Sequence, residues 1–174
     1  MRKVLSLLVF ILIFISCSSV RVITDYDTQT DFEEYKTFAF YKKGIDKAPI
    51  SDLDKKRIMR AIEAEMLAKG FRKSNNPDLL VSIFTKSREK INVTDNRFGT
   101  YWYPWYYGVN QVRVTQRTEG TLFIDFIDKK KKELIWQGIG TGALRMQNVK
   151  KKEERVKEFV KEVLEKYPPK VESK

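Results

Sequence analysis

The sequence has 174 residues, 42% of them hydrophobic and 13% aromatic, which is enough apolar material for one packed core. It carries a formal net charge of +11 and contains one cysteine and no histidine. Zinc sites built on cysteine and histidine are therefore excluded, as are nucleophilic pairs of the Ser-His or Cys-His type. We expect no cofactor, no metal and no enzymatic activity.

The first residues have the composition of an export signal. Arg2 and Lys3 precede an apolar run from Val4 to Ile15 that is interrupted by Ser6. This run of about twelve residues is shorter than the roughly twenty that a spanning helix needs. Residues 1–16 are therefore predicted to be a lipoprotein signal peptide.

Cys17 stands at the end of that run, with Ser18 and Ser19 behind it as a polar tether. The segment Phe14 to Cys17 resembles the bacterial lipobox, in which the cysteine receives a diacylglyceryl group, although Phe14 stands where leucine is usual. Two or three acyl chains on one residue form a stable anchor, whereas a single chain binds a membrane only reversibly. We expect residues 17–21 to be a lipidated, palmitate-bearing tether at the periplasmic face of the outer membrane. The alternatives are an ordinary signal peptide with an incidental cysteine, and a short buried helix.

Two β-branched and aromatic segments follow, at residues 20–27 and 35–41, and both are predicted to be strands. Residues 42–50 contain Gly44 and Pro49 and are predicted to be a loop. Ser51 and Asp54 resemble a capping box at the start of a helix over residues 52–69. Gly70 should end this helix in the left-handed conformation. The periodicity places four residues on its buried face: Ile58, Ala61, Ile62 and Met66.

The second half contains four further predicted strands and a helix. Residues 77–84 are almost continuously apolar and indicate a central strand, and residues 109–117 alternate as another. Residues 120–128 and 133–138 flank four lysines, which is typical of a hairpin with a charged turn. The last element is an amphipathic helix that ends before Pro168-Pro169. Its apolar residues recur at three- and four-residue spacing: Val156, Phe159, Val160, Val163, Leu164 and Tyr167.

This order of elements predicts an α+β fold, with a mainly antiparallel sheet and two helices packed on one face. We expect residues 22–169 to form a single domain and residues 170–174 to be a disordered tail.

Several of these segments resemble a family of bacterial lipoproteins, the domain-of-unknown-function family numbered 4136. The resemblance lies in residues 22–27, 31–32 and 35–40, in Lys69-Gly70-Phe71, and in residues 77–81. It continues at residues 120–122, at Asp125, at Trp136-Gln137-Gly138 and in the last helix with Tyr167-Pro168-Pro169. The resemblance implies a single α+β envelope domain on a lipid anchor, and it implies no catalytic residues.

An aromatic segment between residues 101 and 107 is the clearest candidate binding surface. Rings of this kind suit sugar stacking, membrane interfaces and protein hot spots. Alternatively, alternate rings cover one face of the sheet, although Pro104 argues against a continuous central strand. We predict a partly exposed loop or edge. The candidate residues are Tyr101, Trp102, Tyr103, Trp105, Tyr106 and Tyr107.

The basic charge points to partners in the envelope. Loss of Arg2 and Lys3 with the signal lowers the net charge from +11 to +9. For an exported domain, anionic lipids or polymers are better partners than nucleic acid, which we do not expect. Alternatively, the charge serves only solubility, with lysines 129–132 in a turn and lysines 150–152 at a helix start.

The sequence therefore predicts a membrane-anchored, non-enzymatic binding module that contacts an envelope protein or glycan. A second hypothesis is an accessory component of lipid, lipopolysaccharide or outer-membrane assembly or transport, for which an apolar groove between helix and sheet is expected. A third is an enzyme that uses the carboxylates of Asp25, Asp27 and Asp31, although their spacing is more typical of turns and caps.

Overall fold

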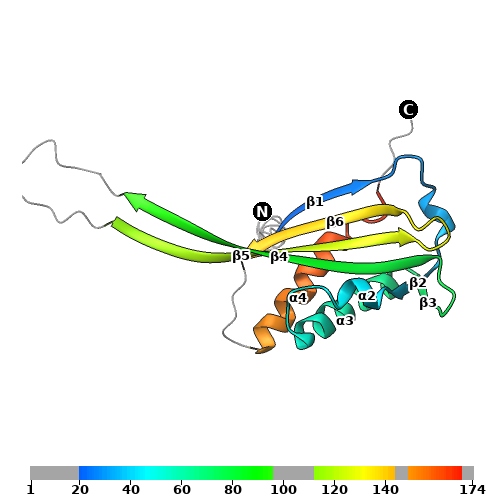
Figure 1. Ribbon diagram of the computed structural model, residues 1–174, viewed down its shortest axis with the longest axis horizontal. Helices are drawn as coiled ribbons and strands as arrows, with labels where there is room; N and C mark the ends of the chain where they lie inside the picture. Colours follow the sequence, from blue (N-terminus) through cyan, green and yellow to red (C-terminus); the bar gives the residue numbers. More distant parts are fainter. Residues whose placement is uncertain (1–19, 96–111, 144–148, 170–174) are drawn as a thin grey trace, which may run out of the picture.

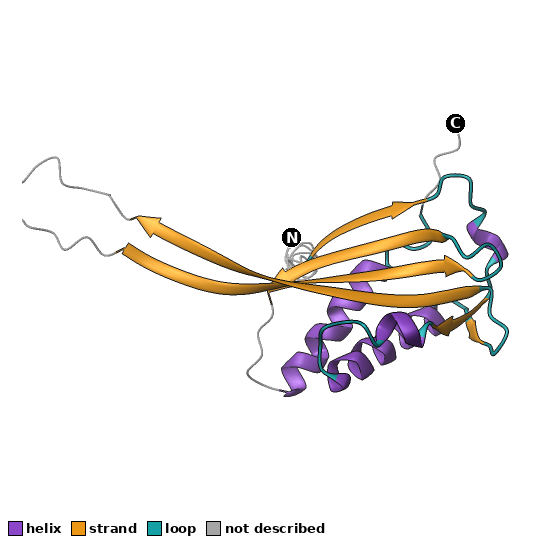
Figure 2. Ribbon diagram, viewed as in Figure 1, coloured by secondary structure: helices purple, strands orange, loops and turns teal. Residues whose placement is uncertain are grey.

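The computed structural model describes residues 20–95, 112–143 and 149–169. These residues form a six-stranded sheet in the order β1-β6-β5-β4-β2-β3, with helices packed against one face (Figures 1 and 2). The strands are β1 (Arg21–Tyr26), β2 (Thr37–Phe40), β3 (Arg72–Lys73), β4 (Leu79–Asp95), β5 (Val112–Asp128) and β6 (Leu134–Ala143). The helices are the 3-10 turn η1 (Phe32–Glu34), α2 (Lys42–Ile45), α3 (Asp52–Ala68) and α4 (Val149–Leu164).

The sheet is mixed, so the α+β class is confirmed but the expectation of a mainly antiparallel sheet is wrong. Strands β1, β6, β5 and β4 pair in antiparallel fashion. Strand β2, however, runs parallel to both β3 and β4. Parallel neighbours need a crossover connection, and the chain between β2 and β4 supplies it with α2 and α3. Helix α2 itself lies in the segment that was predicted to be a loop.

The core lies between the sheet and the helices α3 and α4. Alternate residues of β4 and β5, among them Val81, Ile83 and Ile124, are fully buried on the face that the helices cover. The predicted buried face of α3 is confirmed, since Ile62 and Met66 have no exposed surface. The last helix is confirmed in the same way: Val160, Val163 and Leu164 are buried, and so are Phe159 and, just beyond the helix, Tyr167.

Local signals set the ends of α3 as predicted. The Ser51 hydroxyl accepts a hydrogen bond from the backbone N–H of Asp54 at 3.2 Å, which caps the first turn. Gly70 adopts φ +88° just after the helix, a conformation that side chains with a Cβ rarely take. These two residues fix where the helix begins and ends.

Strands β4 and β5 are longer than predicted. Two segments were predicted as separate strands, at 109–117 and 120–128, but the single strand β5 includes all of the second and residues 112–117 of the first. From Glu89↔Thr118 to Asp95↔Val112 the described residues of β4 and β5 pair only with each other. This two-stranded arm projects beyond the rest of the sheet (Figure 1), over roughly 20 Å at about 3.3 Å per residue.

Two glycines of β6 let helix α4 approach the sheet closely. A Cβ atom on Gly138 would lie 2.5 Å from Cγ1 of Val163. On Gly140 it would lie 2.8 Å from Cγ2 of Val163 and closer still to the ring of Phe159. Only glycine fits at these positions, so they determine the separation between α4 and the sheet.

Replacement of Gly140 by alanine should therefore destabilise the domain by about 1–3 kcal/mol, the usual cost of overpacking a core. Urea denaturation of the two proteins measures this difference. In the double variant Gly140→Ala/Phe159→Leu the smaller side chain makes room, so the loss should be less than the sum of the single losses. Strict additivity of the two changes would show that the ring does not limit the approach.

Candidate functional site

An apolar pocket lies at the end of the sheet from which the arm projects. It has a volume of about 140 Å³ and opens between the sheet, the start of α3 and the first half of α4. A cavity of ~150 Å³ lined by Leu, Ile and Phe is known to stay dry and to bind a molecule of the size of benzene. The described residues that line the pocket are Pro49, Ile50, Asp54, Ile58, Thr85, Lys86, Ser87, Gly120, Thr121, Leu122, Lys152, Arg155, Val156 and Phe159.

The floor of the pocket is part of the core. Ile58 of α3, Leu122 of β5 and Phe159 of α4 are all at least 92% buried and belong to the main apolar cluster. Val156, one turn before Phe159, is half-buried and packs against the same cluster. The pocket therefore continues the core outward rather than interrupting it.

Thr85 brings a hydroxyl group into these apolar surroundings. Its Oγ1 atom is buried and has no hydrogen-bond partner within the part of the chain that the structure describes. A buried hydroxyl without a partner costs about 1–3 kcal/mol relative to its hydrated state. The pocket wall thus contains a polar group whose burial is unfavourable in this structure.

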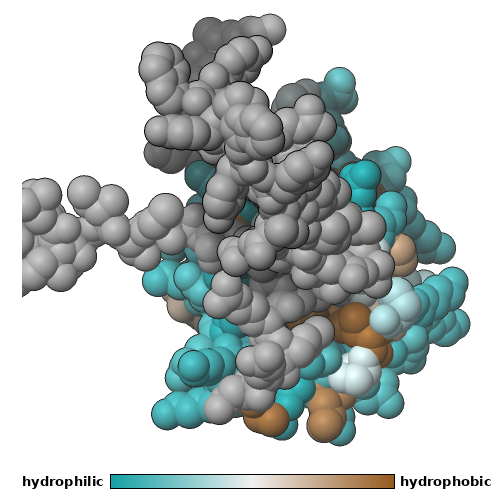
Figure 3. Space-filling model, turned by 90° about the vertical axis from the view of Figure 1, so that its left-hand side faces the viewer, coloured by the Kyte–Doolittle hydropathy of each residue, from teal (hydrophilic) through white to brown (hydrophobic). Residues whose placement is uncertain are grey.

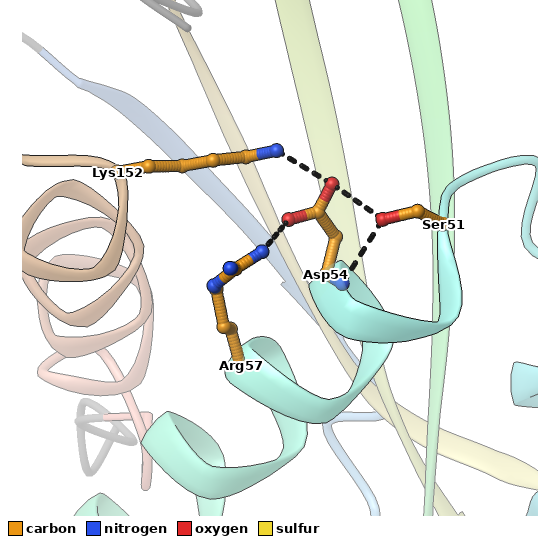
Figure 4. A network of polar contacts seen from close by, with 4 residues as sticks. All are labelled: Ser51, Asp54, Arg57 and Lys152. Atoms are coloured by element: carbon orange, nitrogen blue, oxygen red, sulfur yellow. Dashed lines mark hydrogen bonds and ion pairs between the residues drawn. The ribbon is translucent and has the colours of Figure 1, made fainter. Parts of the chain in front are cut away.

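A network of polar and charged side chains joins the two helices (Figure 4), and two of its members, Asp54 and Lys152, line the pocket. Asp54 of α3 accepts hydrogen bonds from the ammonium of Lys152 of α4 and from the guanidinium of Arg57, both at 2.7 Å. The hydroxyl of Ser51 donates to the same carboxylate at 2.9 Å. Partial burial alone would raise the pKa of Asp54, but the bonds from Lys152, Ser51 and Arg57 outweigh it and lower the pKa.

Positive charge exceeds negative charge in this part of the pocket. Arg155, which also lines it, is paired with Glu158 at 2.8 Å. Of the described residues that line the pocket, three are cationic, Lys86, Lys152 and Arg155, and one is acidic, Asp54. The first turn of α4 adds Lys150 and Lys151 and contains no acidic residue. Cations at the amino end of a helix are disfavoured by its dipole, so their concentration here is not explained by helix stability.

The strand register places the start of the domain at the same end as the pocket. Arg21, the first residue of β1, pairs with Thr141 of β6. Thr141 also pairs with Thr121 of β5, and Thr121 pairs with Lys86 of β4. The last two residues line the pocket. Viewed from this end, the described residues expose apolar surface among hydrophilic side chains (Figure 3).

The residues that were predicted as sites from the sequence lie largely outside the described residues. This holds for Cys17 and for the aromatic segment at residues 101–107. Both therefore stay predictions. In chain order the aromatic segment falls between Asp95 and Val112, which are the described ends of the arm.

All three carboxylates of the enzyme hypothesis accept local hydrogen bonds, and Asp25 accepts from the backbone N–H of Tyr26 at 2.9 Å. Asp27 accepts from the backbone N–H of Gln29 at 2.9 Å and from the Thr30 hydroxyl at 3.0 Å, which together lower its pKa. Asp31 caps the η1 turn by accepting from the N–H of Glu33. These are the turn and cap contacts that their spacing indicates.

A raised carboxyl pKa occurs instead at Asp125, which the sequence did not single out. Burial raises the pKa of Asp125, although the side chain of Gln137 donates to it at 2.7 Å. Asp125 lies on the sheet face opposite the helices, because its neighbours Ile124 and Phe126 face the core. It is therefore separate from the pocket.

The described ranges 20–95, 112–143 and 149–169 contain no group of three or more acidic, cysteine or histidine side chains placed to hold a metal ion. Nor do they contain a helix that is both long and apolar enough to cross a membrane.

Two charged residues on the apolar faces of the helices indicate the pocket, and neither was predicted as a site residue. On α4, Lys152 precedes Val156, Phe159 and Val163 at helical spacing and so lies on the apolar face. On α3, Asp54 precedes Ile58 and Ile62 in the same way. A charged residue of opposite sign at the start of each apolar face indicates an ion pair between the helices.

Together, the fold and the pocket define a small α+β domain with an apolar pocket between sheet and helices. The chain belongs to the family described as Domain of unknown function (DUF4136), whose model matches residues 22–169. Among curated proteins, none matches it.

Several solved structures resemble the domain. One is a PDZ domain protein from Parabacteroides distasonis, with a TM-score of 0.53 and 17% identity, which covers 92% of this chain. The chain spans 39% of that protein, and at this identity the likeness shows the fold alone. Two crystal forms of a PelC dodecamer from Paraburkholderia phytofirmans align over 83% of this chain and 94% of theirs, with 12% identity and a TM-score of 0.44. That score is too low to support any conclusion about this chain.

Replacement of Thr85 by valine should raise the free energy of unfolding by about 1 kcal/mol, because it removes a buried hydroxyl that has no partner. Thermal or urea denaturation measures the change. Thr121→Val is the matched control: the Thr121 hydroxyl lies 3.2 Å from that of Thr141, so its loss should destabilise the domain. A destabilised Thr85→Val protein would mean that the Thr85 hydroxyl has a bonding partner after all.

Proposed function

We propose that this protein is a membrane-anchored lipoprotein of the cell envelope that acts as a non-enzymatic binding module. The lipid on Cys17 holds the domain at the periplasmic face of the outer membrane, and the apolar pocket between the sheet and helices α3 and α4 receives the ligand. The observation that carries this proposal is the pocket itself, a cavity of about 140 Å³ with a buried apolar floor.

The polar groups around the pocket support binding rather than catalysis. The carboxylate of Asp54 is held by Lys152, Arg57 and Ser51, and its pKa is lowered. A general acid at neutral pH needs the opposite shift, toward a raised pKa. Asp54 is therefore suited to position Lys152 beside the pocket.

A second candidate function is favoured by the position of the pocket. An accessory role in lipid, lipopolysaccharide or outer-membrane assembly or transport requires an apolar groove between helix and sheet. The pocket lined by Ile58, Leu122 and Phe159 has that position and character. This role is a special case of the binding module, in which the ligand is a lipid.

Membrane anchoring predicts that the wild-type chain incorporates radiolabelled palmitate and sediments with the outer membrane. In Cys17→Ser neither should occur, because no other cysteine is available for lipidation. Metabolic labelling and sucrose-gradient fractionation of bacterial cells measure both effects. A Cys17→Ser protein that remains in the outer-membrane fraction would contradict the anchor.

Ligand binding in the pocket predicts a specific cross-link in cells. A photo-reactive phenylalanine derivative at Pro49, which is exposed at the edge of the pocket, should form an adduct after irradiation. The pocket-filling variants Val156→Trp and Ile50→Trp should abolish that adduct without loss of the fold, as checked by circular dichroism. The control position is Leu67, which is 49% exposed at the other end of α3, and any adduct there should be unaffected. An adduct at position 49 that survives both filling variants, or no adduct, would refute the proposal.

A further inference from the structure

The shape and volume of the pocket limit what it can hold. Its volume of about 140 Å³ is well below the roughly 300–1,000 Å³ of pockets that enclose a drug-sized ligand. It therefore accommodates a slender apolar group, and the rest of the ligand must lie outside. A single hydrocarbon chain has the required cross-section and lacks the hydrogen-bonding groups that the floor could not satisfy.

The charges at the rim select the polar end of such a ligand. Lys152 and Arg155 both line the pocket, and their side chains are 24% and 23% exposed, so solvent screens them only in part. An ammonium carries three N–H donors and a guanidinium carries five, so a single ion pair does not use all of them. A headgroup with oxygens of negative charge can therefore bond to both side chains while their ion pairs with Asp54 and Glu158 persist.

The position of the pocket relative to the tether brings this ligand within reach. Under the proposed lipidation, the four residue steps from Cys17 to Arg21 span at most about 14 Å when fully extended. Arg21 lies in one cross-strand row with Thr121 and Lys86, at the end where the pocket opens. That end, with its excess of basic residues, then faces the bilayer surface and its anionic lipids.

We propose that the pocket binds one acyl chain of a lipid with an anionic headgroup, taken from the membrane to which the domain is tethered. The chain packs against Ile58, Leu122, Val156 and Phe159, and the headgroup bonds to Lys152 and Arg155. This inference rests on the proposed function and names the ligand of its pocket.

The test uses the full chain reconstituted in phosphatidylcholine vesicles that contain a fatty acid with a photo-reactive diazirine in its chain. The corresponding diazirine fatty alcohol, at the same mole fraction, is the neutral comparison. After irradiation, mass spectrometry locates the labelled peptides. The fatty acid should label peptides of β5 and α4 that line the pocket, and it should do so about tenfold more than the alcohol, the effect of one charge-assisted hydrogen bond.

Substitutions at the rim and in the interior of the pocket separate the roles of headgroup and chain. Arg155→Gln should reduce labelling by the fatty acid toward the level of the alcohol, because only Lys152 then bonds to the headgroup. The control Lys157→Gln removes another α4 cation paired to a glutamate, in this case Glu153 at 3.3 Å, and should change nothing. Val156→Trp and Ile50→Trp should abolish pocket labelling by both probes, because they fill the space that the chain occupies.

Each outcome has one meaning. If acid and alcohol label the pocket equally and Arg155→Gln has no effect, the anionic headgroup is wrong while a binding pocket remains. If neither probe labels pocket peptides, the lipid ligand is wrong. The cross-link from Pro49 in cells then decides separately whether the pocket binds a protein side chain instead.

Discussion

The close contact between helix α4 and strand β6 is the constraint on which the rest of the domain depends. Gly138 and Gly140 leave no room for a Cβ atom beneath Val163 and Phe159, so α4 is held against the sheet along its second half. The first half of α4 contacts α3 through the ion pair of Lys152 with Asp54. The pocket occupies the space between that half of α4, the start of α3 and the sheet.

The contact between helices α3 and α4 changes from apolar to charged along their length. Further along both helices, α3 and α4 are joined through the core, which includes Ile62 and Val160. At their amino ends the link is Asp54 with Lys152, at 2.7 Å. An ion pair of this kind is weak evidence for stability, because desolvation offsets much of its Coulomb energy. Its geometric effect is clearer: it joins the two helix ends at the wall of the pocket.

The sequence predicted most of the elements because their signals are local. Ser51 and Gly70 mark the ends of α3, and the spacing of Val156, Phe159 and Val163 gives the buried face of α4. The parallel pairing of β2 with β4 was not predictable in this way, since it depends on where α3 returns the chain. The same is true of the long strand β5: two strands were predicted, at 109–117 and 120–128, but β4 pairs with β5 continuously from Val112 to Asp128.

The site was less predictable than the fold, and the reason is physical. A pocket is the volume that several elements leave unfilled, and no single segment contains it. Lys152 and Asp54 nevertheless stand on the apolar faces of their helices, where charge is costly unless it is paired. Such a violation of a local pattern is expected at functional sites, because stability alone would favour an apolar residue at each position. The retention of both charges beside an apolar cavity is therefore the feature of this chain that connects its sequence most directly to binding.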